Sequence, residues 1–383
     1  MVDKNLFLHD LAVVAIMKNE GPYLKEWLDY HLLAGVDHFY LYDNESPDMQ
    51  AEVAKPYVAA GLVDYFPFPG KAMQVPAYID AVKRFKFYCR YMAFIDGDEF
   101  IYPKSCGGGV IAEVVDEILS HEPNAAGLTI HWKMFDSNGQ EKADYSRGVL
   151  ERFTHCANGI ARVVKTIANP RKICSFHSTG VHTMMYFKDF FGVDENLNVV
   201  KSFKPTPATA EKIVINHYQC KSLEEYMVKI KRGDAVFPDK EMRTISKFRE
   251  SQYKKGKFDD GILKYRDTKA KVYQPPDKSH TDERLLSALE KNLAPTLQAD
   301  TPQDFYAGKI ETFLTCRAVA SYLKTKLADD TQAKFFEEAA LKAIIKSFSN
   351  PVNEADKGLF KLELSELLKL PYSVVKELRN IQF

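Results

Sequence analysis

The sequence predicts an α/β protein with a mostly parallel, Rossmann-like sheet, and two observations carry this prediction. Short, nearly continuous apolar runs alternate with amphipathic helical stretches in the order β-α-β-α-β-α-β over the first hundred residues or so. Polar groups follow directly after three of these runs, and the ligands of α/β proteins bind outside the carboxyl ends of the strands. We therefore expect a ligand site where these polar groups meet.

The first predicted strand spans residues 11–16 and is apolar throughout, as in a strand that is buried on both faces of a parallel sheet. A polar turn leads to Pro22, which suits the first turn of a helix, and Gly35 suits the end of that helix. His31 falls on the apolar face of this helix together with leucines and a tryptophan. We interpret it as a packed side chain rather than a metal ligand.

Strands are also predicted at residues 38–42 and 62–66, and a helix at residues 74–89 leads to a fourth apolar run. The first run ends at Asn19-Glu20, and the second ends at Asp43-Asn44. Because the carboxyl ends of parallel strands lie at one edge of the sheet, these side chains are expected to cluster there.

The fourth run ends in Asp96-Gly97-Asp98-Glu99, three carboxylates interrupted by one glycine. Gly97 permits a sharp turn, so Asp96 and Asp98 are predicted to face one ion. Mg²⁺ and Mn²⁺ prefer oxygen ligands, often one or two carboxylates completed by substrate phosphates. The turn therefore predicts a site for a metal-bridged diphosphate. A haloacid-dehalogenase phosphatase also places D-x-D after a strand, but normally near the start of the chain and with Thr or Val where Phe100 stands here.

Further strands are predicted at residues 127–132, 161–167 and 213–218, with His177 and His182 bracketing a Ser-Thr-Gly between the last two. Ser222 and Glu225 form a capping box that starts a helix, and Gly233 ends it. His217 lies just before this helix and is predicted as a third metal ligand through its neutral imidazole.

Composition narrows the class of protein. Of 383 residues, 52 are basic and 52 acidic, and this zero net charge argues against nucleic-acid binding as the main activity. The six cysteines contain no C-x-x-C pair, so we expect reduced thiols rather than disulfides or a zinc site. We expect no signal peptide and no transmembrane segment, and therefore a cytoplasmic location that includes the inner face of the membrane.

The chain divides into three predicted parts. Residues 1–235 form the α/β catalytic domain, residues 236–280 are a charged connecting segment, and residues 281–383 have helical patterns throughout. The last part carries no catalytic constellation, so we expect an all-α extension that serves in packing, acceptor docking or homo-oligomer formation.

An ordered set of motifs between residues 11 and 233 resembles the family-2-related glycosyltransferases of the GT-A fold, and most of all the branch that includes family 92 and bacterial relatives of family 2. The motifs are Ala15-Ile-Met-Lys-Asn-Glu20, Glu26-Trp-Leu with Tyr30-His31, Tyr42-Asp-Asn44 with Ser46, Phe94-Ile-Asp-Gly-Asp-Glu-Phe-Ile101, and Asn216-His-Tyr with Lys221-Ser and Glu225-Tyr. Their order along the chain is more specific than any one of them.

The resemblance implies an inverting, metal-dependent transfer of sugar from a nucleotide-diphosphate sugar, most often a UDP-sugar, to a glycan or lipid-linked glycan. The implied ligands of Mn²⁺ or Mg²⁺ are Asp96, Asp98 and His217, and Asp96 also faces the diphosphate. The resemblance also implies that Asn19, Glu20, Asp43 and Asn44 hold the base and ribose of the donor. Lys221 is implied to meet its diphosphate.

A carboxylate is then expected to take the proton of the acceptor hydroxyl. We prefer Glu151, and Asp136 is the other candidate, although the turn around Asp136 departs from the family pattern. Trp132 is either a platform for a sugar ring or a core residue. Two other functions stay open: a nucleotidyltransferase or sugar-nucleotide pyrophosphorylase, and a non-catalytic module that binds nucleotide sugars.

Overall fold

The computed structural model describes residues 7, 9–86, 88–104, 110–177, 180–187, 189–233 and 243–267. The helices are α1 (Gly21–Leu33), α2 (Gln50–Ala59), α3 (Gln74–Phe85), α4 (Ile111–Leu119), α5 (Val149–Arg152), α6 (Leu223–Arg232), α7 (Ile245–Glu250) and α8 (Lys264–Asp267), with 3-10 turns η2 (Pro170–Lys172) and η3 (Gly261–Leu263). The predicted all-α extension at residues 281–383 lies outside the described residues.

The strands are β1 (His9–Met17), β2 (His38–Asp43), β3 (Val63–Pro67), β4 (Cys89–Phe94), β5 (Glu99–Pro103), β6 (Ala125–Met134), β7 (His155–Cys156), β8 (Ala161–Ala168), β9 (Ile173–His177), β10 (Gly180–Tyr186), β11 (Phe191–Val193), β12 (Val199–Val200), β13 (Ile213–His217) and β14 (Lys257–Phe258). All the strands that the sequence predicted are present. The additional ones are mostly short, and they include the hairpin β9–β10.

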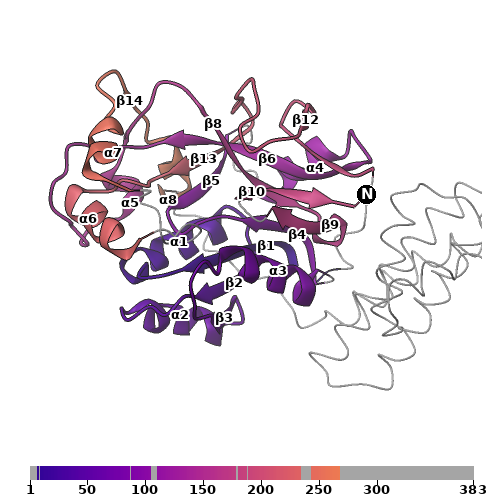
Figure 1. The fold of residues 1–383 in the computed structure, drawn as a ribbon, viewed down its shortest axis with the longest axis horizontal. Helices are drawn as coiled ribbons and strands as arrows, with labels where there is room; N and C mark the ends of the chain where they lie inside the picture. The colour runs from indigo at the N-terminus through magenta and orange to yellow at the C-terminus, as the bar shows by residue number, and fades with distance from the viewer. Residues whose placement is uncertain are drawn as a thin grey trace, which may run out of the picture.

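One sheet of ten strands organises the domain (Figure 1). Its main path runs β12-β11-β6-β8-β4-β1-β2-β3, and β13 pairs with both β5 and β6. Strands β1 to β4 are parallel, whereas β8 is antiparallel to both β4 and β6. This mixed, mostly parallel sheet covered by helices confirms the predicted α/β class.

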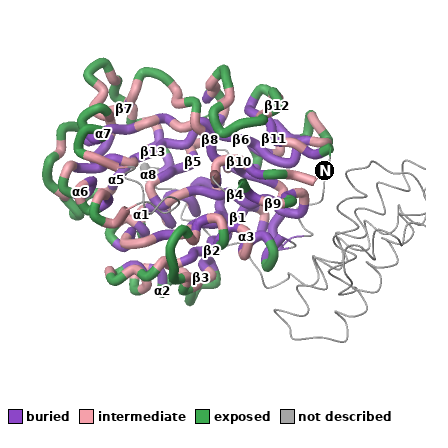
Figure 2. The backbone as a smooth tube through the Cα atoms, viewed as in Figure 1, coloured by how far each residue is buried: buried purple, intermediate pink, exposed green. Residues whose placement is uncertain are grey.

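The central strand β1 is buried on both faces, as its unbroken apolar run predicted (Figure 2). Leu11, Val13 and Ala15 pack into one hydrophobic cluster with helices α1 and α4. Ala12 and Val14 point to the opposite face and pack into a second cluster with α3. Alternate side chains of a strand point to opposite faces, so one strand serves both halves of the core.

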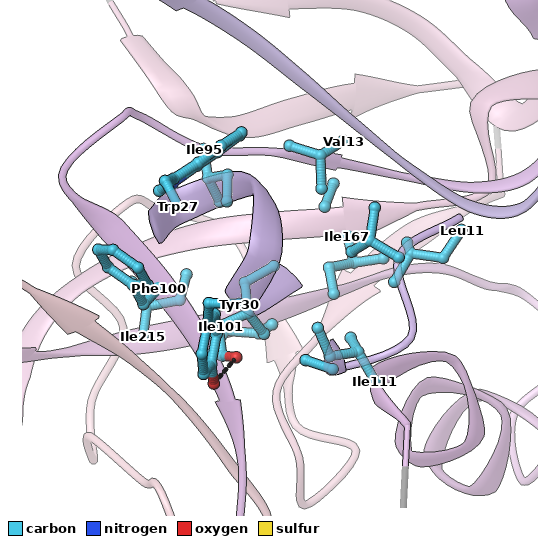
Figure 3. Close-up of a cluster of buried hydrophobic side chains, with 14 of the residues drawn as sticks. Leu11, Val13, Trp27, Tyr30, Ile95, Phe100, Ile101, Ile111, Ile167 and Ile215 are labelled. Atoms are coloured by element: carbon cyan, nitrogen blue, oxygen red, sulfur yellow. Dashed lines mark hydrogen bonds between the residues drawn. The ribbon is translucent and has the colours of Figure 1, made fainter. Parts of the chain in front are cut away.

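Helix α1 fixes the strand that follows the acidic turn. Trp27 Nε1 donates to the carbonyl oxygen of Glu99 at 2.8 Å. Tyr30 Oη donates to that of Ile101 at 2.7 Å (Figure 3). His31 Nδ1 donates to the carbonyl oxygen of Trp27, which leaves Nε2 to accept the backbone N–H of Ile101 at 3.3 Å. His31 is therefore a packed residue, and burial lowers its pKa to about 3. The start of β5, and with it the acidic turn, is held in place by these bonds.

The described part of the predicted connecting segment packs against the same domain. Strand β14 pairs with β7, and Ile262 and Tyr265 join the hydrophobic cluster around α1. Tyr265 Oη also donates to the carbonyl oxygen of Pro103 at 3.2 Å. Among the described residues, no helix has the length and apolar character needed to cross a membrane.

Candidate active site

A cavity of about 670 Å³ opens where the predicted polar groups meet, outside the carboxyl ends of β1, β2, β4 and β13. It is lined by residues 16–18, Glu20, Asn44, residues 70–74, residues 96–98, Trp132, residues 180–182, His217, Gln219, Tyr226, Lys229, Arg232, Gly233, Arg243 and Lys247. Of the predicted site residues, the structure brings Glu20, Asn44, Asp96, Asp98 and His217 to this cleft.

The acidic turn between β4 and β5 forms one wall of the cleft. At Gly97, a Cβ atom would lie 3.2 Å from Met17 Cε and 3.3 Å from Glu20 Cγ, so the end of β1 packs closely against the turn. The side chain of Glu99 points inward and is fully buried, and its Oε2 accepts the N–H of Asp96 at 3.0 Å. Burial raises the pKa of Glu99 well above its usual range. Glu99 therefore supports the turn from below rather than facing a ligand.

The carboxylate of Asp98 contacts both an imidazole and an ammonium group. Its Oδ1 lies 3.5 Å from Nε2 of His217, and its Oδ2 accepts from Nζ of Lys229 at 2.5 Å. Lys229 also donates to the carbonyl oxygen of Gln219 at 2.9 Å. Burial disfavours the charged carboxylate, but Lys229 and His217 outweigh it and hold the pKa of Asp98 well below its usual range. Asp98 is thus charged at neutral pH and has a cation already against it.

Asp96 is held by two different partners. Gln74 Nε2 donates to its Oδ1 at 2.7 Å, and Lys165 Nζ donates to its Oδ2 at 3.0 Å. The ammonium of Lys165 is fully buried and also lies 3.7 Å from Glu99 Oε2. Burial opposes the charge of Lys165, but the two carboxylates raise its pKa above the ordinary value. Both oxygens of Asp96 are therefore oriented by the protein.

The residues at the acidic turn suit a divalent cation only when a bound ligand supplies further coordinating oxygen atoms. Among the described residues, no group of three or more His, Cys, Asp or Glu side chains converges as a ready-made metal site. Asp98 and His217 do face each other, and Nδ1 of His217 is buried with no hydrogen-bond partner in the described part of the chain. Such a pair, completed by diphosphate oxygens and water, suits Mg²⁺ or Mn²⁺. The metal role of Asp96, Asp98 and His217 stays a prediction.

Glu20, just before α1, forms ion pairs with basic side chains on α6 and on the residues before it. Its Oε2 accepts from Lys221 at 3.1 Å and its Oε1 accepts from Arg232 at 2.9 Å. Burial disfavours the charge of Glu20, but these two cations lower its pKa. Lys221 is buried at 1% exposure and does not line the cleft, because its ammonium points to Glu20 and to the ring of Tyr23. The structure therefore does not bring Lys221 to the place where a diphosphate was expected.

Of the four residues predicted at the ends of β1 and β2, Glu20 and Asn44 line the cleft, and Asn19 and Asp43 brace the loops. Asn44 lines the cleft, and its side chain donates to the carbonyl oxygens of Phe68 and Gly70. The backbone N–H of Asn19 donates to Ser46 Oγ, and Asp43 Oδ1 accepts the N–H of Ser46, both at 3.0 Å. Asn19 and Asp43 thus hold the loops together around one serine.

Neither of the predicted bases lines the cleft. Glu151, on α5, is paired with Arg147 at 3.0 Å, with 39% of its side chain exposed. Asp136 is buried in its turn, where Oδ2 accepts from His155 Nδ1 at 2.6 Å and from the N–H of Tyr253 at 3.0 Å. This geometry does not favour the sequence-based preference for Glu151, because these contacts hold both carboxylates elsewhere.

The cleft also contains functional groups that the sequence interpretation missed. Lys229 and Arg232 are three residues apart on α6, a spacing that places them on one helical face, but the sequence does not tell which face meets the cleft. Lys165 is the charged residue in the buried half of β8, and a buried lysine needs an acidic partner. That was the available signal for its contact with Asp96.

Comparisons with known proteins agree with the resemblance seen in the sequence. Residues 14–257 match the family described as Glycosyltransferase family 92. Glycosyltransferase family 92 protein RCOM_0530710 of Ricinus communis is 24% identical over 230 residues, which cover 60% of this chain and 39% of that protein. Glycosyltransferase family 92 protein At1g27200 of Arabidopsis thaliana is 25% identical over 243 residues, covering 60% and 38%. The chain thus spans about two fifths of the length of these relatives.

Among solved structures, residues 1–349 of TarS from S. aureus in complex with UDP give 12% identity and a TM-score of 0.32, covering 95% of this chain and 93% of that chain. Glucosyl-3-phosphoglycerate synthase from Mycobacterium tuberculosis, in complex with Mn²⁺, UDP and glucosyl-3-phosphoglycerate, gives 19% identity and a TM-score of 0.23, covering 32% and 44%. These scores are too low to transfer a ligand or a site to this chain.

Proposed function

The chain belongs to glycosyltransferase family 92, and on that premise we propose that its cleft moves a sugar from a nucleotide-diphosphate sugar, specifically a UDP-sugar, to a hydroxyl of a glycan or lipid-linked glycan. The observation that carries the proposal is the pair Asp98–His217, 3.5 Å apart in the cleft and beside the cationic side chains of α6. This pairing of a hard-cation site with fixed positive charges suits a diphosphate leaving group.

In the proposed binding mode the acidic turn and the basic helix hold the donor together. Asp98 and His217 would hold a divalent cation, Mn²⁺ or Mg²⁺, which supplies positive charge against the diphosphate when bound. Lys229 and Arg232 lie on the same side of the cleft and would stabilise the negative charge that develops on the departing nucleotide. Asp96, fixed by Lys165 and Gln74, would orient the nucleotide through a carboxylate whose position is already set.

The remainder of the donor would lie over the ends of β1 and β2. Glu20 and Asn44 line the cleft there, and residues 70–74 close the same side. Asn19 and Asp43 contribute indirectly, because they hold the two loops around Ser46. Inversion at the anomeric carbon follows if the acceptor hydroxyl attacks from the side opposite the diphosphate, in a single displacement.

Calorimetry with UDP and Mn²⁺, together with release of UDP from UDP-glucose, UDP-galactose and UDP-N-acetylglucosamine, tests this proposal. We expect UDP to bind in the presence of Mn²⁺ and at least one donor to be hydrolysed slowly. Asp98→Asn should abolish both, whereas Asp189→Asn, at an exposed aspartate outside the cleft, should leave both unchanged. Full activity of Asp98→Asn, or no UDP binding by the wild type, would overturn the proposal. Synthesis of a nucleotide sugar from a nucleoside triphosphate would favour a nucleotidyltransferase instead.

A further inference from the structure

The cleft has two chemically different walls. Its cations come mainly from α6, α7 and the segment before α7, as Lys229, Arg232, Arg243 and Lys247. A second wall, from β6 and β10, presents Trp132 and residues 180–182 and contributes no lysine or arginine to the lining. A diphosphate leaving group belongs against the cations, so the neutral aromatic wall is where an uncharged hydroxyl acceptor fits.

The three carboxylates that line the cleft all have cationic partners. Glu20 is paired with Arg232, Asp96 with Lys165, and Asp98 with Lys229, at distances from 2.5 to 3.0 Å. A carboxylate that already accepts from an ammonium or a guanidinium group is a poor acceptor for a further proton. None of the three is therefore well placed to deprotonate an attacking hydroxyl.

His182 on β10 differs from these carboxylates. Its Nδ1 lies 3.0 Å from the carbonyl oxygen of Val164, and a carbonyl oxygen only accepts, so Nδ1 carries the proton. The lone pair is therefore on Nε2, which has no hydrogen-bond partner among the described residues. Thr166 Oγ1 donates to the carbonyl oxygen of His182 at 2.8 Å and ties β10 to β8. Backbone and ring are thus both fixed with an acceptor nitrogen available to the cleft.

The ring of Trp132 separates His182 from the proposed metal site. Its centroid lies 4.3 Å from the ring of His217 and 5.3 Å from the ring of His182. The ring centroid of Phe203 lies 5.8 Å from that of His182. Phe203 is 47% exposed, so it continues the aromatic wall toward solvent. An acceptor sugar lying on this wall would bring a hydroxyl next to Nε2 of His182, one side chain away from the donor.

We infer that His182 is the general base of the proposed transfer, an inference that rests on the proposed function. The acceptor oxygen forms a bond to the anomeric carbon of the donor while the bond from that carbon to the diphosphate oxygen breaks. The bonding pair leaves with the nucleoside diphosphate. The hydroxyl proton passes to Nε2, giving an imidazolium that later releases the proton to water, so that atoms and charge balance.

The protonation state of His182 agrees with this role. Burial, the nearby ammonium of Lys165 and His217 together lower the pKa of His182 to about 4. Asp96 acts in the opposite direction but is outweighed. The imidazole is therefore neutral at neutral pH, and its pKa is similar to that of an ordinary carboxylate. Because the basic form is lost on protonation, transfer by the wild type should fall only as the pH drops toward 4.

The test compares His182→Gln, His182→Ala and a matched control, His177→Gln, an exposed histidine on the neighbouring strand β9. The probes are UDP with Mn²⁺ for binding, and hydrolysis of the UDP-sugar that the wild type cleaves fastest, with water as acceptor. We expect His182→Gln to bind UDP within about threefold of the wild type and to hydrolyse the donor roughly a hundredfold more slowly, as for loss of a general base. The control should match the wild type in both.

Chemical rescue separates a base from a structural role. Added imidazole should restore part of the hydrolysis by His182→Ala, and azide, which needs no deprotonation, should yield a glycosyl azide with this variant. Hydrolysis by His182→Gln within threefold of the wild type would overturn the inference, as would a loss in His182→Ala that neither imidazole nor azide relieves. Loss of hydrolysis in Glu151→Gln instead would return the role to Glu151. A wild type that neither binds UDP nor releases it from donors overturns the proposed function, and the inference with it.

Discussion

Replacing Lys229 by methionine isolates the ion pair that occupies the centre of the cleft. The ammonium lies 2.5 Å from Asp98 Oδ2, and the side chains are only 8% and 14% exposed. With an effective dielectric constant of about 20, the attraction across this distance is roughly 6–7 kcal/mol. Desolvation of the two charges offsets much of it, and removing one partner from a buried pair typically costs about 3–5 kcal/mol.

We expect Lys229→Met to lower the free energy of unfolding by about 3 kcal/mol at neutral pH, toward the low end of that range. His217, 3.5 Å from Oδ1, and water reaching Asp98 compensate part of the lost charge. Urea denaturation measures the effect, and Lys231→Met, at the exposed neighbouring position on α6, is the matched control. In an Asp98→Asn background the same substitution should cost much less, because the carboxylate that Lys229 neutralises is gone.

The dependence of stability on acidic pH provides a second test of the ion pair between Lys229 and Asp98. The pKa of Asp98 is held well below its usual range, so its contribution to stability is fully present above about pH 4 and is lost as the pH falls below that through the folded-state pKa. This acid-side loss should shrink in Lys229→Met. A destabilisation below about 1 kcal/mol, or one that stays the same in the Asp98→Asn background, would refute the reasoning.

Three further substitutions test other parts of the site and core. His217→Ala should weaken Mn²⁺-dependent UDP binding at least tenfold while leaving the fold intact by circular dichroism; unchanged affinity in calorimetry would reject its metal role. Gly97→Ala should displace the acidic turn, since a Cβ would meet Met17 at 3.2 Å, and should reduce UDP affinity, whereas Gly159→Ala, with nothing within 4 Å, should not. His31→Gln should make the stability less dependent on pH. Burial lowers the pKa of His31 to about 3, so the wild type loses roughly 4 kcal/mol of its free energy of unfolding as the pH falls from about 6.5 to 3. An unchanged profile of stability against pH would contradict this.

The sequence predicted the frame of the site because strand patterns and caps are local signals. The unbroken apolar run of β1 identified a strand with two buried faces, and burial of both faces confirms it. The capping box of Ser222 and Glu225 placed the start of α6, and both of its hydrogen bonds are present. The polar residues that follow the strands, including Asp98 and His217, could then be assigned to one edge of the sheet from topology alone.

Side-chain partners across the cleft could not be predicted in the same way. Lys221 and Lys229 both follow His217, and nothing in the sequence distinguishes the lysine buried against Glu20 from the one that reaches the cleft. The distinction depends on the left-handed backbone of Lys221, with φ of 52°, and on the rotation of α6 about its axis. His182 was visible only as one of two histidines around a short turn, because its proposed role depends on how β10 packs against β8.

The charge balance of the cleft explains how such a site can be stable before a donor arrives. Each of the three carboxylates that line it in the described part of the chain has a resident cation, so none of these charges lacks a partner. A divalent cation and the diphosphate of a nucleotide sugar would enter as a pair whose charges nearly cancel. Lys229 would then leave Asp98 for the diphosphate as the divalent cation takes its place, so that each negative group keeps a positive partner. Binding of the metal and of the nucleotide should therefore be strongly coupled, each favouring the other, since either one alone would upset the balance.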